Sequence, residues 1–119
     1  MAITIGSRVS VAWDYDSYEE RHVTGRVHSW REIGRSVPDC VVKLDERLST
    51  FGFDVPDVPR ACSGSFLVLS PRYVGQTWAE DEGTVHVELH ETDPTVLDAG
   101  EQVLVGPRVA SHGVYRRLD

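Results

Sequence analysis

The chain has 119 residues, of which 40% are hydrophobic and 26% are charged, and its formal net charge at pH 7 is −7. These proportions are typical of one globular domain and argue against global disorder and fibrous repeats. No apolar run approaches the roughly 18 residues that a membrane span needs, and an acidic surface repels phosphate backbones. We therefore expect neither a membrane protein nor a nucleic-acid-binding protein.

The N-terminus and the cysteine usage indicate the cellular compartment. The first residues carry no basic and apolar leader, and the two cysteines, Cys40 and Cys62, are too few for a disulfide framework. We expect a cytoplasmic protein with reduced thiols and a single domain over residues 1–119. Cys40 alternates with the apolar Val42 and Leu44, which predicts a buried thiol rather than a nucleophile. A bridge between the two cysteines stays open at this point.

Alternation of apolar and polar residues with a period of two dominates the chain and predicts β-strands. The first strand is expected over residues 3–13, with a bend at Gly6. The pattern places the further strands at residues 23–30, 40–45, 66–69, 84–90, 103–105 and 114–118. Eighteen valines support this prediction, because a branched Cβ fits a pleated sheet better than a helix. Residues 66–69 are apolar on both faces, which predicts a central strand or one that a second copy covers.

Capping signals predict two short helical turns. Asp16 and Glu19 have the spacing of a capping box at the start of residues 16–21. Pro94, placed directly after an aspartate, is suited to the first position of a turn over residues 94–99. The expected fold class is all-β: a single small barrel or barrel-like sandwich of about six or seven mostly antiparallel strands, with one or two short helical turns.

The least regular segment covers residues 46–64 and contains Pro56 and Pro59. It also carries apolar side chains of its own, including Phe51 and Phe53. Long loops of this composition usually either cover an open end of a sheet or serve a function. We expect a long loop that covers one end of the barrel. A recess beneath it would suit a small ligand, which makes a carrier protein one hypothesis.

An aromatic and acidic segment is the main candidate for a binding site. It carries Trp13, Tyr15 and Tyr18, with carboxylates between them. Aromatic side chains offer contact area at little entropic cost, and carboxylates attract arginine and lysine. The segment is therefore typical of a surface that binds a basic or proline-containing peptide, and we expect Phe51 and Phe53 to contribute to that surface. The alternative is that Trp13 belongs to the core, because its parity matches the apolar residues before it.

Two short stretches resemble segments of eukaryotic SH3 domains. The Trp-Asp-Tyr sequence at residues 13–15 resembles their aromatic-Asp-Tyr segment, and Pro-Arg-Tyr-Val at residues 71–74 resembles their later Pro-x-x-Tyr-Val segment. In that family these aromatic residues line a groove for polyproline helices. The resemblance covers about ten of the 119 residues. Beyond these it is a general likeness to small SH3-like or Tudor-like barrels, which implies a fold and not a ligand.

A second candidate site is the sequence His-Val-Glu-Leu-His at residues 86–90. Residues two apart share a face of a strand, so His86, Glu88 and His90 form a row on the polar side. The two histidines would stand roughly 13 Å apart. A metal ion would therefore need a third ligand from another strand, for which His28 is the candidate. The alternative is a solvated polar face without a metal.

The usual catalytic motifs do not occur in the sequence, which has no nucleophile elbow, no dinucleotide-binding glycine motif and no phosphate loop. We therefore expect no catalytic residues and no cofactor. The protein is interpreted as a non-enzymatic cytosolic binding module that recognises a basic or proline-containing protein segment. The alternative function is a small metal-binding barrel or a metal-dependent enzyme that uses the strand from His86 to His90. Self-association stays open.

Overall fold

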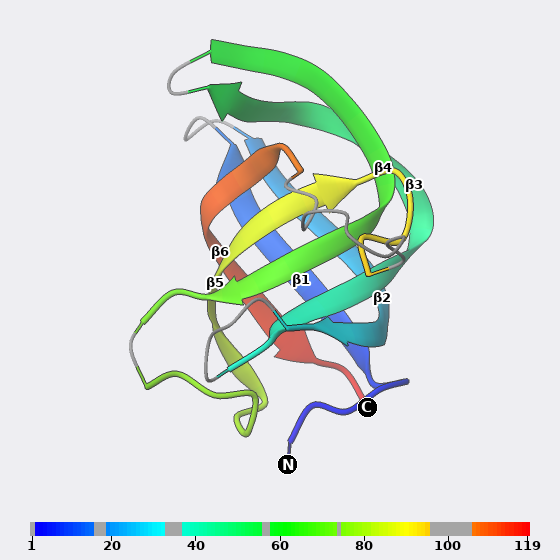
Figure 1. Cartoon of the computed structure of the whole chain (residues 1–119), viewed down its shortest axis with the longest axis vertical. Helices are drawn as coiled ribbons and strands as arrows, with labels where there is room; N and C mark the ends of the chain where they lie inside the picture. Colours follow the sequence, from blue (N-terminus) through cyan, green and yellow to red (C-terminus); the bar gives the residue numbers. More distant parts are fainter. Residues whose placement is uncertain (1, 16–18, 33–36, 56–57, 74, 96–105) are drawn as a thin grey trace.

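The computed structural model describes residues 2–15, 19–32, 37–55, 58–73, 75–95 and 106–119. Its strands are β1 (Arg8–Tyr15), β2 (Glu19–Arg31), β3 (Asp39–Val55), β4 (Val58–Pro71), β5 (Glu82–His90) and β6 (Arg108–Arg117). Each strand pairs antiparallel with the next and β6 pairs with β1, so the sheet closes into a barrel (Figure 1). These residues contain no helix, which confirms the all-β expectation. It follows that no helix among them is long and apolar enough to cross a membrane.

The first strand begins later than its alternation predicts. Gly6 has a φ of +92°, in the left-handed region that glycine adopts without strain. The resulting turn separates Ile3 from β1. Ile3 is nevertheless 4% exposed and belongs to the core, and its backbone N–H donates to the carbonyl of Trp78 at 3.0 Å. The apolar pattern thus predicted the burial of this residue correctly, and Gly6 ends the regular strand.

Neither predicted helical turn is a helix in the described part of the chain. Residues 19–21 of the first belong to β2, and residues 16–18 lie outside the described residues. In the second, Pro94 and Thr95 form a turn, in which the N–H of Thr95 donates to Oδ1 of Asp93 at 2.9 Å. Residues 96–99, and the strand expected at residues 103–105, lie outside the described residues.

Alternate residues of the strands point into the barrel and form its core. The inward residues of β1 and β5 are at most 3% exposed, and they are Val9, Val11, Trp13, Val85, Val87 and Leu89. Aromatic side chains fill the end of the barrel near the β4–β5 connection. There the ring centroid of Trp78 lies 6.0 Å from that of Trp30 and 5.3 Å from that of Tyr115.

The central strand β4 is buried on both of its faces. Leu67 and Leu69 belong to the core, whereas Val68 points to the outside of the barrel, yet all three are at most 1% exposed. On the adjacent β3, the outward side chain of Val41 is also completely buried. The outer surface of these strands is therefore covered within one copy of the chain, and its burial does not require a second copy.

Most of residues 46–64, expected as an irregular loop, form strands instead. The β2–β3 ladder ends at Leu44 and the β4–β5 ladder begins at Phe66, but β3 and β4 stay paired with each other beyond these points. Mutual pairing therefore makes this segment a hairpin, although prolines interrupt its alternation. We call Leu48–Val55 together with Val58–Gly64 the arm.

The arm curls over one end of the barrel (Figure 1). Near its tip, Phe53 lies opposite Arg108 at the start of β6. Pro59 lies in the part of β4 that has no β5 neighbour, where a missing backbone N–H costs no ladder hydrogen bond. The arm therefore adds an accessible two-stranded surface to an otherwise closed barrel.

Candidate functional site

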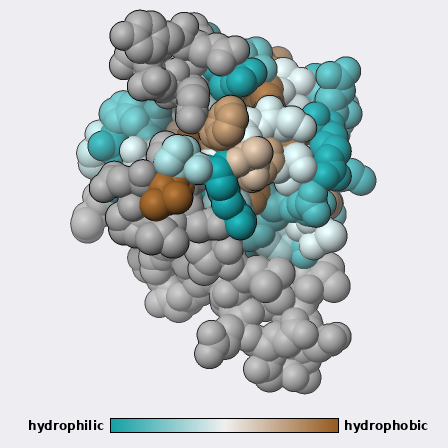
Figure 2. Space-filling model, turned by 90° about the horizontal axis from the view of Figure 1, so that it is seen from above, coloured by the Kyte–Doolittle hydropathy of each residue, from teal (hydrophilic) through white to brown (hydrophobic). Residues whose placement is uncertain are grey.

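The two faces of the arm differ in exposure. Thr50 and Cys62 lie opposite each other, and Thr50 is 7% exposed while Cys62 packs against the core. Phe51 and Ala61 form the next pair, on the opposite face, because successive residues of a strand point to opposite sides. Phe51 is 47% exposed. Figure 2, which looks down on this end of the molecule, shows hydrophobic groups near the centre and hydrophilic groups at the sides.

Gly52 allows the arm to approach the start of β6 closely. A Cβ at this position would lie 3.0 Å from Cβ of Pro107 and 3.1 Å from Sγ of Cys62. These distances are shorter than ordinary contacts, so a larger residue would push the arm away from the barrel. Phe53, the neighbour of Gly52, has its side chain outside the described residues.

Trp13 lies in the core, on the same inward face of β1 as Val9 and Val11. It is 3% exposed, and its indole Nε1 has no hydrogen-bond partner within the part of the chain that the structure describes. Tyr15 is the last residue of β1 and its side chain lies outside the described residues, as does the whole of Tyr18. Among the aromatic residues chosen from the sequence, Phe51 is therefore the one whose side chain is both described and exposed.

The two segments that resemble SH3 domains lie at opposite ends of the barrel. Through their ladders with β6, the start of β1 and the start of β5 lie at the same end. Tyr73 belongs to the connection that enters β5 at that end, whereas Tyr15 ends β1 at the other. These two aromatic residues therefore do not share one groove.

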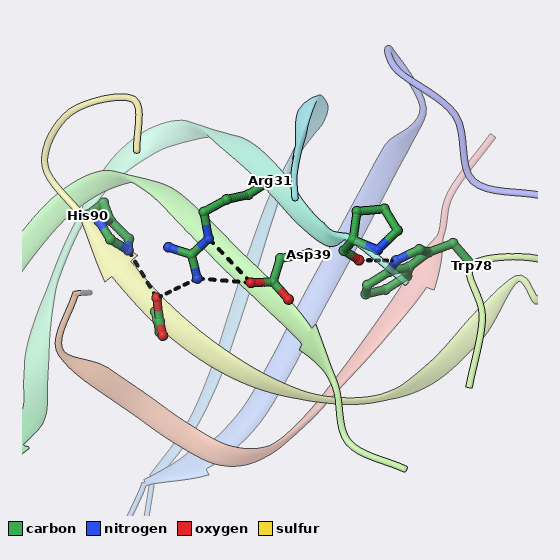
Figure 3. Close-up of polar contacts among 6 residues, drawn as sticks. Arg31, Asp39, Trp78 and His90 are labelled. Carbon is green, nitrogen blue, oxygen red and sulfur yellow. Dashed lines mark hydrogen bonds and ion pairs between the residues drawn. The ribbon is translucent and has the colours of Figure 1, made fainter. Parts of the chain in front are cut away.

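A buried ionic cluster lies on the outside of the barrel (Figure 3). Arg31 lies opposite Asp39 in the β2–β3 ladder, and its Nη2 lies 2.9 Å from Oδ2 of Asp39 and 3.2 Å from Oε2 of Glu88. The same Oε2 lies 3.1 Å from Nε2 of His90. The side chains are 6% exposed for Arg31, 0% for Asp39, 12% for Glu88 and 6% for His90. One buried arginine thus bridges two carboxylates.

Glu88 stays ionised in this cluster. Burial by itself would raise the pKa of its carboxyl group, but the hydrogen bond with His90 and the positive charge of Arg31 outweigh that effect. The pKa of Glu88 therefore lies below its ordinary value of 4.5. The cluster is a compensated ion network, and its low exposure leaves little room for a substrate.

Of the residues expected as metal ligands, Glu88 and His90 are in contact, but no third ligand joins them in the part of the chain that the structure describes. His28 lies 3.5 Å from the carboxylate of Asp93. His86 shares a strand face with Glu88, but Glu88 is engaged by Arg31 and His90. Among the described residues, no three His, Cys, Asp or Glu side chains are arranged to hold a metal ion.

Sequence reasoning did not select Arg31 and Asp39 as members of this cluster. One signal was present: a carboxylate on a strand between apolar residues needs a cation when it is buried. The chain has eleven arginines, and the pattern does not tell which of them lies beside Glu88. Only the β2–β3 register and the closure of the barrel identify Arg31.

No disulfide joins Cys40 and Cys62. Cys40 is 1% exposed, and burial together with the neighbouring carboxylate of Asp39 raises the pKa of its thiol to about 12. The thiol is therefore protonated at physiological pH and has little nucleophilic character. Cys62 is partly exposed on the arm.

The carrier hypothesis requires an enclosed recess beneath the segment that contains Pro59. This residue is exposed, and Pro56 lies outside the described residues. A recess of about 400 Å³ lies between Arg21 and the arm, and its other lining residues are Ser49, Thr50, Phe51, Ala61, Cys62 and Ser63. Its mixed polar and apolar lining differs from the mainly apolar pockets that bind small ligands.

A second recess opens where β2 and β3 separate. The ladder between them ends with Gly25 opposite Leu44, while β2 extends back to Glu19 against β1 alone. The recess has a volume of about 400 Å³ and is lined by His22, Val23, Thr24, Asp45, Glu46, Arg47 and Leu48. We call it the β2–β3 notch. A closed barrel normally leaves no free strand edge, so the notch is a local exception to closure.

Comparison with protein-family models, with curated proteins and with solved structures finds no match for this chain. Its function is therefore inferred from the geometry described above.

Proposed function

We propose that the protein is a non-enzymatic cytoplasmic binding module that recognises a basic or proline-containing segment of another protein. The observation that carries this proposal is the outer face of the arm, where Phe51 is 47% exposed and lies opposite the exposed Ala61. Val58, near the turn of the arm, is 58% exposed. Exposed apolar residues gathered on one projecting element are typical of interaction sites. Tyr15 and Tyr18 are included in the proposed binding surface on the basis of the sequence alone.

The charge of the molecule supports a basic partner. The net charge of −7 makes the approach of a cationic segment favourable over a long range. Phe51 offers the kind of rigid apolar contact that dominates binding energy at protein interfaces. The proposal thus combines electrostatic attraction with one apolar anchor.

The test uses fluorescein-labelled synthetic peptides of equal length, one set basic with and without proline and one set acidic, titrated by fluorescence anisotropy. We expect the basic peptides to bind, and Phe51→Ser to weaken binding about tenfold, as loss of an aromatic anchor does. Val114→Ser is the matched control, because Val114 is 41% exposed but lies on β6. Equal binding by the two variants, or no binding of basic peptides, would contradict the proposal.

The metal-binding alternative rests on His86, Glu88, His90 and His28, and no observation favours it over the binding module. A metal ion at Glu88 would have to displace the guanidinium of Arg31. Elemental mass spectrometry of untagged protein, purified without chelator, tests this alternative. About one equivalent of zinc, iron or manganese that is lost in His90→Ala would support it.

A further inference from the structure

We propose that the β2–β3 notch receives an extended basic segment of the partner as an added strand on β2. This inference rests on the proposed function and specifies how the backbone of the bound segment is held. Strand addition to a free sheet edge is a general mode of peptide recognition, in which main-chain hydrogen bonds supply affinity.

The backbone of β2 presents hydrogen-bonding groups to the notch. The backbone N–H and C=O of Val27 point toward the β1 side. The N–H donates to the carbonyl of Ser7 at 2.9 Å, and the carbonyl accepts from the N–H of Gly6 at 2.8 Å. The backbone groups of successive residues point to opposite sides of a strand. Those of Thr24 and His22 therefore point toward β3. The β2–β3 ladder has no residue pair beyond Gly25 and Leu44, although the hydroxyl of Thr24 still donates to Oδ2 of Asp45 at 2.6 Å.

The side chains that line the notch suit an added strand. Val23 and Leu48 line it and also pack against the core. They give the notch an apolar floor, on which every second side chain of an extended segment can rest. The intervening side chains would point outward, toward the charged rim.

The rim of the notch favours basic side chains. Arg47 forms an ion pair with Glu91, and Asp45 forms one with Arg8 at 3.2 Å. Glu46 is exposed and forms no ion pair within the described residues. The rim therefore carries an excess of negative charge. This charge, together with the net charge of −7, disfavours a second copy of this acidic chain as the occupant.

Amide hydrogen exchange of the isotope-labelled protein tests the inference. The probe is an eight-residue peptide of alternating lysine and valine, and the control replaces lysine with glutamate. We expect the basic peptide to slow exchange at the amides of Thr24 and His22 at least about tenfold. The amide of Val23 points toward β1 and serves as the internal reference, because it should be protected with and without peptide.

Three outcomes are distinguishable. Slower exchange at Thr24 and His22 supports strand addition. Binding that slows exchange only in the arm around Phe51 overturns strand addition and leaves the proposed function standing. No binding of the basic peptide overturns both.

A charge reversal distinguishes the effect of the charges at the notch from the effect of the net charge of the protein. Glu46→Lys should weaken binding of the basic peptide about fivefold or more, because it reverses a rim charge. Glu80→Lys makes the same change in net charge on the β4–β5 connection, outside the notch lining, and should weaken binding less. Equal weakening by the two variants would show that only the net charge acts, and would overturn the assignment to the notch.

Discussion

Arg31 of β2 lies directly opposite Asp39 of β3, and the Nη2 atom of Arg31 lies 2.9 Å from Oδ2 of Asp39. Neither side chain is more than 6% exposed. The same guanidinium reaches past β3 and β4 to Glu88 of β5. One arginine therefore links residues of three strands, β2, β3 and β5, and its loss would remove a guanidinium from beside two buried carboxylates.

Arg31→Leu should lower the free energy of unfolding by about 3–5 kcal/mol, the usual cost of leaving a buried charge uncompensated. Urea denaturation at pH 7 measures this loss. Arg8→Leu is the matched control, because it breaks the Arg8–Asp45 pair, in which both side chains are about 40% exposed. Such exposed pairs contribute less than about 1 kcal/mol. Similar losses in the two variants would contradict a structural role for the buried cluster.

The stabilising effect of Glu88 should disappear at acidic pH. Its pKa is lower in the folded protein than its ordinary value of 4.5, so the unfolded chain binds more protons between these two values. The contribution is complete above pH 4.5 and is lost as the pH falls through the folded-state pKa. Stability curves of the wild type and Glu88→Gln should converge below pH 4.5. A difference between the curves that is constant from pH 7 to pH 3 would refute the ionised Glu88, and Glu82→Gln controls for loss of an exposed carboxylate on the same strand.

The two thiols should differ strongly in reactivity. Cys40 is buried and its thiol has a pKa raised to about 12, whereas Cys62 is partly exposed. At pH 8 a maleimide should label Cys62 in the folded protein and reach Cys40 only after denaturation. Peptide mapping by mass spectrometry identifies the labelled site. Equal labelling rates of the two cysteines in the folded protein would contradict this prediction, because they would mean that the start of β3 opens readily and exposes Cys40.

Gly52→Val should loosen the arm. The added side chain would meet Cβ of Pro107 and Sγ of Cys62 at distances below ordinary contact, at a cost of about 1–3 kcal/mol. We expect faster maleimide labelling of Cys62 and a lower midpoint of thermal unfolding. Ser49→Val is the control, since Ser49 is exposed on the same strand. Unchanged labelling in Gly52→Val would mean that the arm does not depend on this close contact.

The alternation of apolar and polar residues was sufficient to predict a strand where that strand buries one face and pairs with a neighbour on each side. Residues 84–90 alternate strictly, and the structure contains β5 from Glu82 to His90, with Val85, Val87 and Leu89 buried. Parity also decided between the two interpretations of Trp13, because the indole follows the inward valines of β1 into the core. The arm escaped prediction, since its strands interrupt their alternation with glycine and proline and are held mainly by pairing with each other.

The candidate sites were harder to predict than the fold. The amino-acid composition of residues 46–64 pointed to Phe51 as a binding residue. Its side chain is exposed because Phe51 and its partner Ala61 lie on the outer face of the arm. The row from His86 to His90 was recognised as one strand face, whereas the cation that compensates Glu88 was not. No sequence pattern indicated the β2–β3 notch, because it exists only where two paired strands separate.

By itself the sequence determined the strands with clear alternation, many of the residues that enter the core and the net negative charge, because a period of two and a net charge are local or additive properties. The tertiary structure alone decided that Arg31 meets Asp39 and Glu88, that β3 and β4 continue as an arm, and that β2 keeps a free edge. These features depend on register. Alternation shows which face of a strand is buried, but closure of the barrel and the packing of distant residues determine which residues stand opposite each other.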